Sequence, residues 1–313
     1  MRSRCLAVTT ALILTTALAA CGSDNSSSSS TGTSSTASLP GKGKPAVTLG
    51  DKNFTEQYIL GELYAQALKA KGYTVKVKSN IGSSEIIDKA LTSGQVDLYP
   101  EYTGVVVTVL AKEPDNPTSA SQTYDKAKAF ENGRGFELLD TTPFFDADGL
   151  AVKPAYAAKY KLSDVADLKN VPGKFSYGAP PENRTRYQGL LGMKKAYGLN
   201  NVDFKPLSIG LQYKALATGK IDVAAVFTTD AQLAGGKYTV LKDSKGIFGF
   251  QNVAPVVSKK VLAAQGPEFA ATLNAVSAKL TNEAMQTMNG AVDLDKKKPA
   301  DVAATFLKAN GLL

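Results

Sequence analysis

The sequence contains no histidine and no tryptophan, and it has only two cysteines, Cys5 and Cys21. Without histidine, Ser-His and Cys-His catalysis are excluded, and the commonest metal ligand is missing. The sequence also lacks a G-x-S-x-G or S-x-x-K motif for serine acyl transfer and a glycine-rich phosphate-binding loop. We therefore expect a protein that is not an enzyme, with no catalytic residue, no metal and no cofactor.

The first 21 residues have the pattern of a secretory signal peptide. Arg2 and Arg4 precede an apolar run at 6–20 that ends in Leu-Ala-Ala-Cys. This run is shorter than the about 20 apolar residues that a membrane span needs. Its ending resembles the bacterial lipobox, in which the cysteine becomes the lipid-bearing N-terminus, so Cys21 is the expected lipidation site. An ordinary signal peptide that happens to precede a cysteine is the alternative.

Residues 22–44 consist mainly of serine, threonine, glycine and alanine. This composition cannot bury enough apolar surface to fold, so we expect a disordered tether. The formal net charge of the chain is +8, but its lysines are scattered. A nucleic-acid surface would cluster basic residues with aromatic residues on one face, so we expect no nucleic-acid partner.

Short strands alternate with helices after the tether. The pattern predicts strands at 47–49, 74–79 and 95–99, and the same rhythm returns in the second half of the chain. Such alternation is typical of an α/β fold with a mainly parallel sheet. The third strand should end at Pro100, because proline cannot donate a ladder hydrogen bond.

Helix boundaries follow from capping residues. Asn53 and Glu56 have the spacing of a capping box, which predicts a helix that runs to Lys71. Helices expected at 261–289 and 299–310 should pack back on the first lobe.

Two stretches share one pattern and lie 125 residues apart. Ala90-Leu91-x-x-Gly94-x-Val96-Asp97 matches Ala215-Leu216-x-x-Gly219-x-Ile221-Asp222. Five positions after each aspartate comes an aromatic residue followed by threonine, at Tyr102 and Phe227. The repeat predicts two similar lobes that each contribute one ring to a shared cleft. Open α/β sheets bind ligands at this carboxyl edge.

Several ordered motifs resemble those of a known family. They are DKNFTEQ at 51–57, DLYPEYTG at 97–104, GLQYKAL at 210–216, TD at 229–230 and NVAPV at 252–256. On these motifs the chain resembles the glycine betaine/choline/carnitine-type substrate-binding proteins of osmoprotectant ABC importers. The resemblance implies a two-lobe α/β fold of the periplasmic-binding-protein (type II) class, with a ligand cleft between the lobes. Lobe 1 would comprise 45–147 plus 252–313, and lobe 2 would comprise 148–251.

The resemblance also implies an aromatic cage for a quaternary ammonium group and basic side chains for a carboxylate. Tyr102 keeps one cage tyrosine and Phe227 replaces a second, whereas Asp148 and Gln251 stand where two further tyrosines are usual. Lys52 and Arg186 match the basic positions. With Asn53 and the four cage positions they give the expected ligand-binding set, which is Lys52, Asn53, Tyr102, Asp148, Arg186, Phe227 and Gln251.

The incomplete cage leaves the solute open. The resemblance implies a small zwitterionic or quaternary-ammonium compatible solute of the betaine, choline, carnitine or proline type. If Asp148 pairs with a cationic or hydrogen-bearing amine, an amino acid or another non-betaine solute is the alternative. A glycosidase that uses Glu101 and Asp148 as a carboxylate pair, and a lipoprotein adhesin or scaffold, are further alternatives. Arg184 instead of Arg186 as the anion contact also remains open.

The resemblance implies an extracytoplasmic monomer that passes its solute to an ABC permease and its ATPase. The membrane contact would be made through lipid on Cys21. Because one acyl chain binds a membrane only marginally, we expect several chains, such as palmitate, on this cysteine.

Overall fold

The computed structural model describes residues 38–113 and 116–313. The predicted signal peptide, Cys21 and the tether up to residue 37 lie outside the described residues. Residues 38–313 form one compact unit. Residues 38–44, the end of the predicted tether, include a turn in which the Gly41 N–H donates to the Lys71 carbonyl at 2.9 Å. The folded region therefore begins before residue 45.

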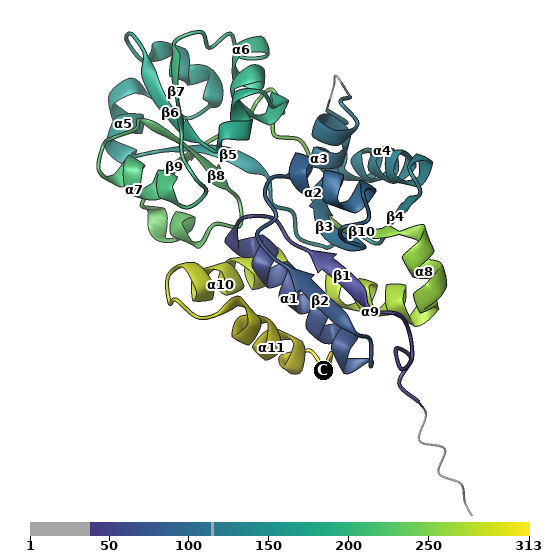
Figure 1. Ribbon diagram of the computed structural model, residues 1–313. Helices are drawn as coiled ribbons and strands as arrows, with labels where there is room; N and C mark the ends of the chain where they lie inside the picture. Colours follow the sequence, from purple (N-terminus) through teal and green to yellow (C-terminus); the bar gives the residue numbers. More distant parts are fainter. Residues whose placement is uncertain (1–37, 114–115) are drawn as a thin grey trace, which may run out of the picture. The chain divides into compact units, whose positions relative to one another are not determined.

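The first lobe is built on a five-stranded sheet with the order β2-β1-β3-β10-β4 (Figure 1). Its strands are β1 (Val47–Gly50), β2 (Val75–Lys78), β3 (Leu98–Tyr102), β4 (Phe136–Leu138) and β10 (Val253–Ser258). β1 runs parallel to β2 and β3, whereas β10 runs antiparallel to β3 and β4. The chain thus returns to the first lobe after building the second.

Helices from both ends of the described chain surround this sheet. They are α1 (Thr55–Ala70), α2 (Ser84–Thr92), α3 (Thr103–Val105), the π-helix η1 (Val106–Leu110), α4 (Ala120–Gly133), α8 (Lys259–Gln265), α9 (Pro267–Ser277), α10 (Asn282–Asp293) and α11 (Pro299–Ala309). Leu63 of α1 shares one apolar core with Phe269 of α9 and Leu307 of α11. The prediction that the C-terminal helices pack on the first lobe is confirmed. The segment expected as one helix at 261–289 is divided into three, and Gly266 at a φ of 84° separates the first two.

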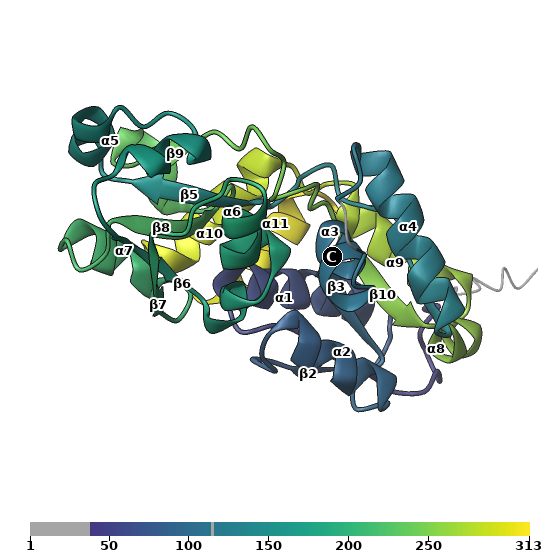
Figure 2. The same cartoon turned by 90° about the horizontal axis from the view of Figure 1, so that it is seen from above.

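The second lobe has a five-stranded sheet with the order β7-β6-β8-β5-β9. Its strands are β5 (Asp148–Val152), β6 (Phe175–Ala179), β7 (Val202–Pro206), β8 (Val223–Phe227) and β9 (Thr239–Leu241). Its helices are α5 (Pro154–Tyr160), η2 (Val165–Asn170), η3 (Pro181–Arg184), η4 (Tyr187–Leu191), α6 (Gly192–Lys195), α7 (Leu211–Ala217) and η5 (Ala231–Gly236). Seen from above, the strands of the second lobe lie to the left and those of the first lobe to the right (Figure 2).

The repeat in the sequence corresponds to a repeat in the two sheets. The Asp97 carboxylate accepts the Thr48 N–H at 2.7 Å, and the Asp222 carboxylate accepts the Ser176 N–H at 2.8 Å. Each aspartate therefore links the start of a central strand to a parallel neighbouring strand by a hydrogen bond, β3 to β1 in the first lobe and β8 to β6 in the second. Tyr102 and Phe227 end these two strands.

Two local predictions are wrong. Pro100 lies inside β3, opposite Pro255 of β10. Opposed residues of an antiparallel pair alternate between hydrogen-bonded and non-hydrogen-bonded positions. Two prolines, which have no N–H, fit opposite each other at a non-hydrogen-bonded position. The predicted capping box is also absent, because α1 begins after Phe54 with no capping side chain. The Glu56 carboxylate is used elsewhere, as described below.

None of the helices in the described part of the chain combines the length and the apolar character that crossing a membrane requires.

Candidate ligand-binding cleft

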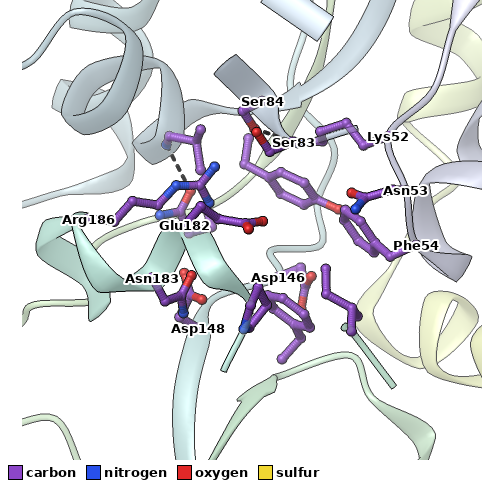
Figure 3. Close-up of a pocket in the computed structure, with 16 residues that line it drawn as sticks. Lys52, Asn53, Phe54, Ser83, Ser84, Asp146, Asp148, Glu182, Asn183 and Arg186 are labelled. Atoms are coloured by element: carbon purple, nitrogen blue, oxygen red, sulfur yellow. Dashed lines mark hydrogen bonds between the residues drawn. The ribbon is translucent and has the colours of Figure 1, made fainter. Parts of the chain in front are cut away.

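Residues from both lobes line one small cavity, here called the cleft (Figure 3). The cleft holds all seven predicted residues, namely Lys52, Asn53, Tyr102, Asp148, Arg186, Phe227 and Gln251. Lys52, Asn53 and Phe54 lie on one side of it, facing Asp148, Asn183 and Arg186 on the other. The cavity volume is about 40 Å³. Since one water needs at least about 10–15 Å³, the cleft has room only for a small solute or a few waters.

Lys52 follows the end of β1 and is 3% exposed. Its ammonium donates to Glu101 Oε1 at 2.5 Å and to Ser84 Oγ at 3.1 Å, and it lies 4.3 Å from the centroid of the Tyr102 ring. Burial lowers the pKa of Lys52, and the negative charge of Glu101 opposes this shift. An ammonium has three N–H donors, so one remains for a solute.

Arg186 connects the two lobes across the cleft. Its guanidinium donates to both carboxylate oxygens of Glu85 in α2, at 3.1 Å from Nε and 2.7 Å from Nη2. Burial acts to raise the pKa of Glu85, but the hydrogen bonds and charge of Arg186 hold it at about 2. Arg184 instead lies 4.8 Å from the centroid of the Phe204 ring. Of the two arginines, Arg186 is therefore the one that lines the cleft.

Three aromatic rings form a stack along the cleft. Phe54 lies between Tyr102 and Phe227, with centroid distances of 6.2 Å and 5.7 Å and interplanar angles of 22° and 15°. The stack combines rings from both lobes, and such faces attract a cation. Phe54 is absent from the predicted set. The available signal was its position directly after Lys52 and Asn53.

Asp148 and Gln251 both line the cleft but have different surroundings. Asp148 begins β5 opposite Phe227 of β8. Burial raises the pKa of Asp148 to about 6, against the opposing charge of Arg186. The Gln251 amide accepts the Val105 N–H at 3.1 Å and donates to the Phe248 carbonyl at 3.1 Å. Asp148 thus supplies a negative charge at neutral pH. The Gln251 side chain is hydrogen-bonded to backbone and contributes to the surface of the cleft.

A hydroxyl group lies between two buried carboxyl groups beside the cleft. Thr229 Oγ1 is 2.6 Å from Glu56 Oε2 in the first lobe and 2.8 Å from Asp146 Oδ1. One hydroxyl hydrogen can serve only one of these oxygens at a time, so the two carboxyl groups share this donor. Burial raises the pKa of both Glu56 and Asp146, and the hydrogen bonds from Thr229 oppose this shift. The sequence did not indicate this second contact between the lobes.

Two carboxylates near the cleft accept hydrogen bonds from backbone N–H groups. Glu101 Oε1 accepts the Tyr102 N–H at 2.7 Å, and Asp230 Oδ2 accepts the Phe227 N–H at 2.9 Å. Glu101 is fully buried behind Lys52 and is not among the residues that line the cleft. The glycosidase alternative therefore lacks one of its two carboxylates at the cavity. Within residues 38–113 and 116–313, no histidine, cysteine or carboxylate group is arranged to hold a metal ion.

Comparison with known proteins agrees with this geometry. Residues 45–309 match the family described as the substrate-binding domain of the ABC-type glycine betaine transport system. A glycine-betaine-binding protein of Pseudomonas aeruginosa is 35% identical over 276 residues, which cover 85% of this chain and 88% of that protein. The carnitine transport binding protein OpuCC of Listeria monocytogenes is 30% identical over 289 residues, which cover 88% of this chain and 91% of that protein.

A solved structure shows the same two-lobe fold. The crystal structure of a glycine betaine/carnitine/choline ABC transporter has a TM-score of 0.68 and 28% sequence identity, and the match covers 85% of this chain and 99% of that one. The family consists of binding proteins, which confirms the prediction that the chain is not an enzyme. The chain belongs to the family of substrate-binding domains of ABC-type glycine betaine transport systems, and it is the extracytoplasmic solute-binding component of an ABC importer.

Proposed function

We propose that this protein captures a small solute with a substituted ammonium group, and that the seven predicted residues together with Phe54 bind it. The observation that carries this proposal is the position of three stacked rings beside the Asp148 carboxylate in one buried cavity. A cation against such rings gains about 0.5–2 kcal/mol when it is desolvated.

The negative end of a zwitterion has two candidate partners. Lys52 and Arg186 are each paired with a resident carboxylate, but both retain N–H donors beyond those pairs. A solute carboxylate can therefore bind without displacing Glu101 or Glu85. A betaine-type zwitterion fits this arrangement.

A choline-type cation without a carboxylate is the second candidate. Asp146, Asp148 and Glu182 line the cleft. Glu101 and Glu85, the acidic partners of Lys52 and Arg186, do not line it but are in contact with these two basic residues. The negative charge in and around the cleft therefore exceeds the positive charge, which favours a solute with a net positive charge. An amino acid, whose ammonium hydrogens can bind Asp148, is the third class.

Transport would follow from closure of the lobes. The Arg186–Glu85 and Thr229–Glu56 contacts join the lobes, and a solute that binds both sides adds further contacts to the closed state. The closed protein would deliver its solute to an ABC permease driven by an ATPase. Lipid on Cys21 and the tether would keep it near that permease and raise its effective concentration.

A thermal-shift and calorimetric panel tests this function. The panel contains glycine betaine, choline, carnitine, proline and other amino acids, and a solute at 100 times its dissociation constant stabilises the fold by about 2.7 kcal/mol. We expect betaine or choline to bind, and the Asp148→Ala variant to bind choline more weakly than the unchanged protein does. If Asp148→Ala binds every solute equally well, Asp148 has no binding role. If no member of the panel binds, the proposed solute class is wrong.

A further inference from the structure

The hydroxyl group of Tyr102 is hydrogen-bonded to two side chains of α1. It donates to Glu56 Oε1 at 2.8 Å and accepts from the Gln57 amide at 3.3 Å. Its single hydrogen is used by Glu56 and cannot be donated to a solute. The Tyr102 side chain lines the cleft, so a solute there meets the ring of Tyr102 and not a free hydroxyl. Glu56 therefore helps to set the position of this ring.

The second carboxylate oxygen of Glu56 is bound by the second lobe and by α10. Oε2 accepts from Thr229 Oγ1, just after β8, at 2.6 Å and from the Asn289 amide of α10 at 3.1 Å. The same Asn289 amide donates to the Thr229 carbonyl at 3.2 Å. Glu56 thus holds the ring of Tyr102 with one oxygen and the second lobe with the other.

The two oxygens of a carboxylate cannot move independently. Glu56 is 3% exposed, so protein donors and not bulk water supply most of its hydrogen bonds. A buried carboxylate that loses a donor is costly unless it finds another. When the Thr229 hydroxyl is withdrawn, we expect the Glu56 carboxylate to turn toward its remaining donors. The Tyr102 hydroxyl, bound to Oε1, then moves with it, and so does the ring in the cleft.

We propose that Glu56 is a positioning residue, which couples the placement of the Tyr102 ring to the contact of Thr229 with the first lobe. Phe227, the matching ring of the repeat, has no hydroxyl through which a carboxylate could hold it. The proposal rests on the proposed function in one respect, namely that the Tyr102 ring contacts the solute. Because coupling between two contacts is reciprocal, a solute on this ring also strengthens the contact between Thr229 and Glu56.

Fluorine NMR of the whole protein tests the link without any solute. The protein is labelled with fluorotyrosine, and the Tyr102 signal is assigned by its loss in Tyr102→Phe. Thr229→Val removes the donor but keeps the shape of the side chain, whereas Thr229→Ser keeps the hydroxyl. We expect Thr229→Val to shift the Tyr102 signal and Thr229→Ser to leave it in place. If Thr229→Val leaves the signal unchanged, or if both variants shift it equally, the proposal is wrong.

Calorimetry with choline and glycine betaine tests the effect on binding. We expect Thr229→Val to weaken binding about tenfold, which corresponds to about 1.4 kcal/mol, and Thr229→Ser to stay within about twofold. In the Tyr102→Phe background the hydroxyl link is already absent, so Thr229→Val should cause little further loss. Thr229→Val also removes a donor from Asp146, an effect that the comparison of the two backgrounds cancels.

The two backgrounds also separate coupling from a merely structural role. If the losses in Tyr102→Phe and Thr229→Val add fully in the double variant, Thr229 acts independently of the ring and the proposal is overturned. If neither probe binds the unchanged protein, the proposed solute class is wrong. The fluorine signal then still decides whether Glu56 links Thr229 to Tyr102, so the two failures are distinguishable.

Discussion

Replacement of Lys52 by methionine tests the buried ion pair at the base of the cleft. Lys52 and Glu101 have side-chain exposures of 4% and 0%. In Lys52→Met the Glu101 carboxylate stays buried, with only the Tyr102 N–H as a donor to Oε1 and with Oε2 already unpaired. Removing one partner of a buried ion pair typically destabilises a fold by about 3–5 kcal/mol. At about 2–4 °C per kcal/mol for a domain of this size class, we expect Tm to fall by about 6–20 °C.

The double variant Lys52→Met with Glu101→Gln is the decisive control. It removes both charges, and the glutamine oxygen can still accept the Tyr102 N–H. We expect it to recover most of the stability lost in Lys52→Met, as measured by urea unfolding. Binding of a solute that carries a carboxylate should stay weak in both, because both lack the Lys52 ammonium. If the double variant is no more stable than Lys52→Met, the loss does not come from an unpaired buried charge, and our interpretation of the pair is refuted.

Three further predictions concern the cleft and its surroundings. Phe227→Ala should weaken binding of a quaternary ammonium solute by about 2- to 30-fold, the equivalent of one cation–aromatic contact, whereas Phe227→Tyr keeps the ring and should stay within about threefold by calorimetry. Arg186→Met removes two charge-assisted hydrogen bonds between the lobes and should weaken solute binding about tenfold, while Arg184→Met should not; equal effects would contradict the assignment of Arg186. Burial raises the pKa of Asp230 to about 7, from an ordinary value of 3.8. The folded protein therefore holds a proton that the unfolded chain has lost, and stability to urea should fall as pH rises from about 4 to 7. Asp230→Asn should flatten this dependence, and an unchanged slope would show that Asp230 is not its source.

Much of the architecture could be predicted from the sequence. Alternating strands and helices are local patterns, and they indicate an α/β fold without knowledge of any long-range contact. The repeat of Asp97 and Asp222 indicated two similar lobes. In the structure each aspartate accepts a backbone N–H from the parallel strand next to it, so the two residues have equivalent places in the two sheets. Local rules failed at Pro100 and at the Asn53 cap. The end of β3 and the use of the Glu56 carboxylate depended on segments distant in the sequence, namely β10 and Thr229, and local sequence patterns carry no information about such contacts.

The sequence by itself indicated seven of the residues that line the cleft through its strand ends and ordered motifs, but it did not indicate Phe54. Only the tertiary structure decided how their charges are paired. Arg186 binds Glu85, 101 positions away, and Thr229 binds Glu56, 173 positions away. The energy of a charge depends on its distance to other charges and on its exposure to water, and both arise only when distant segments pack together.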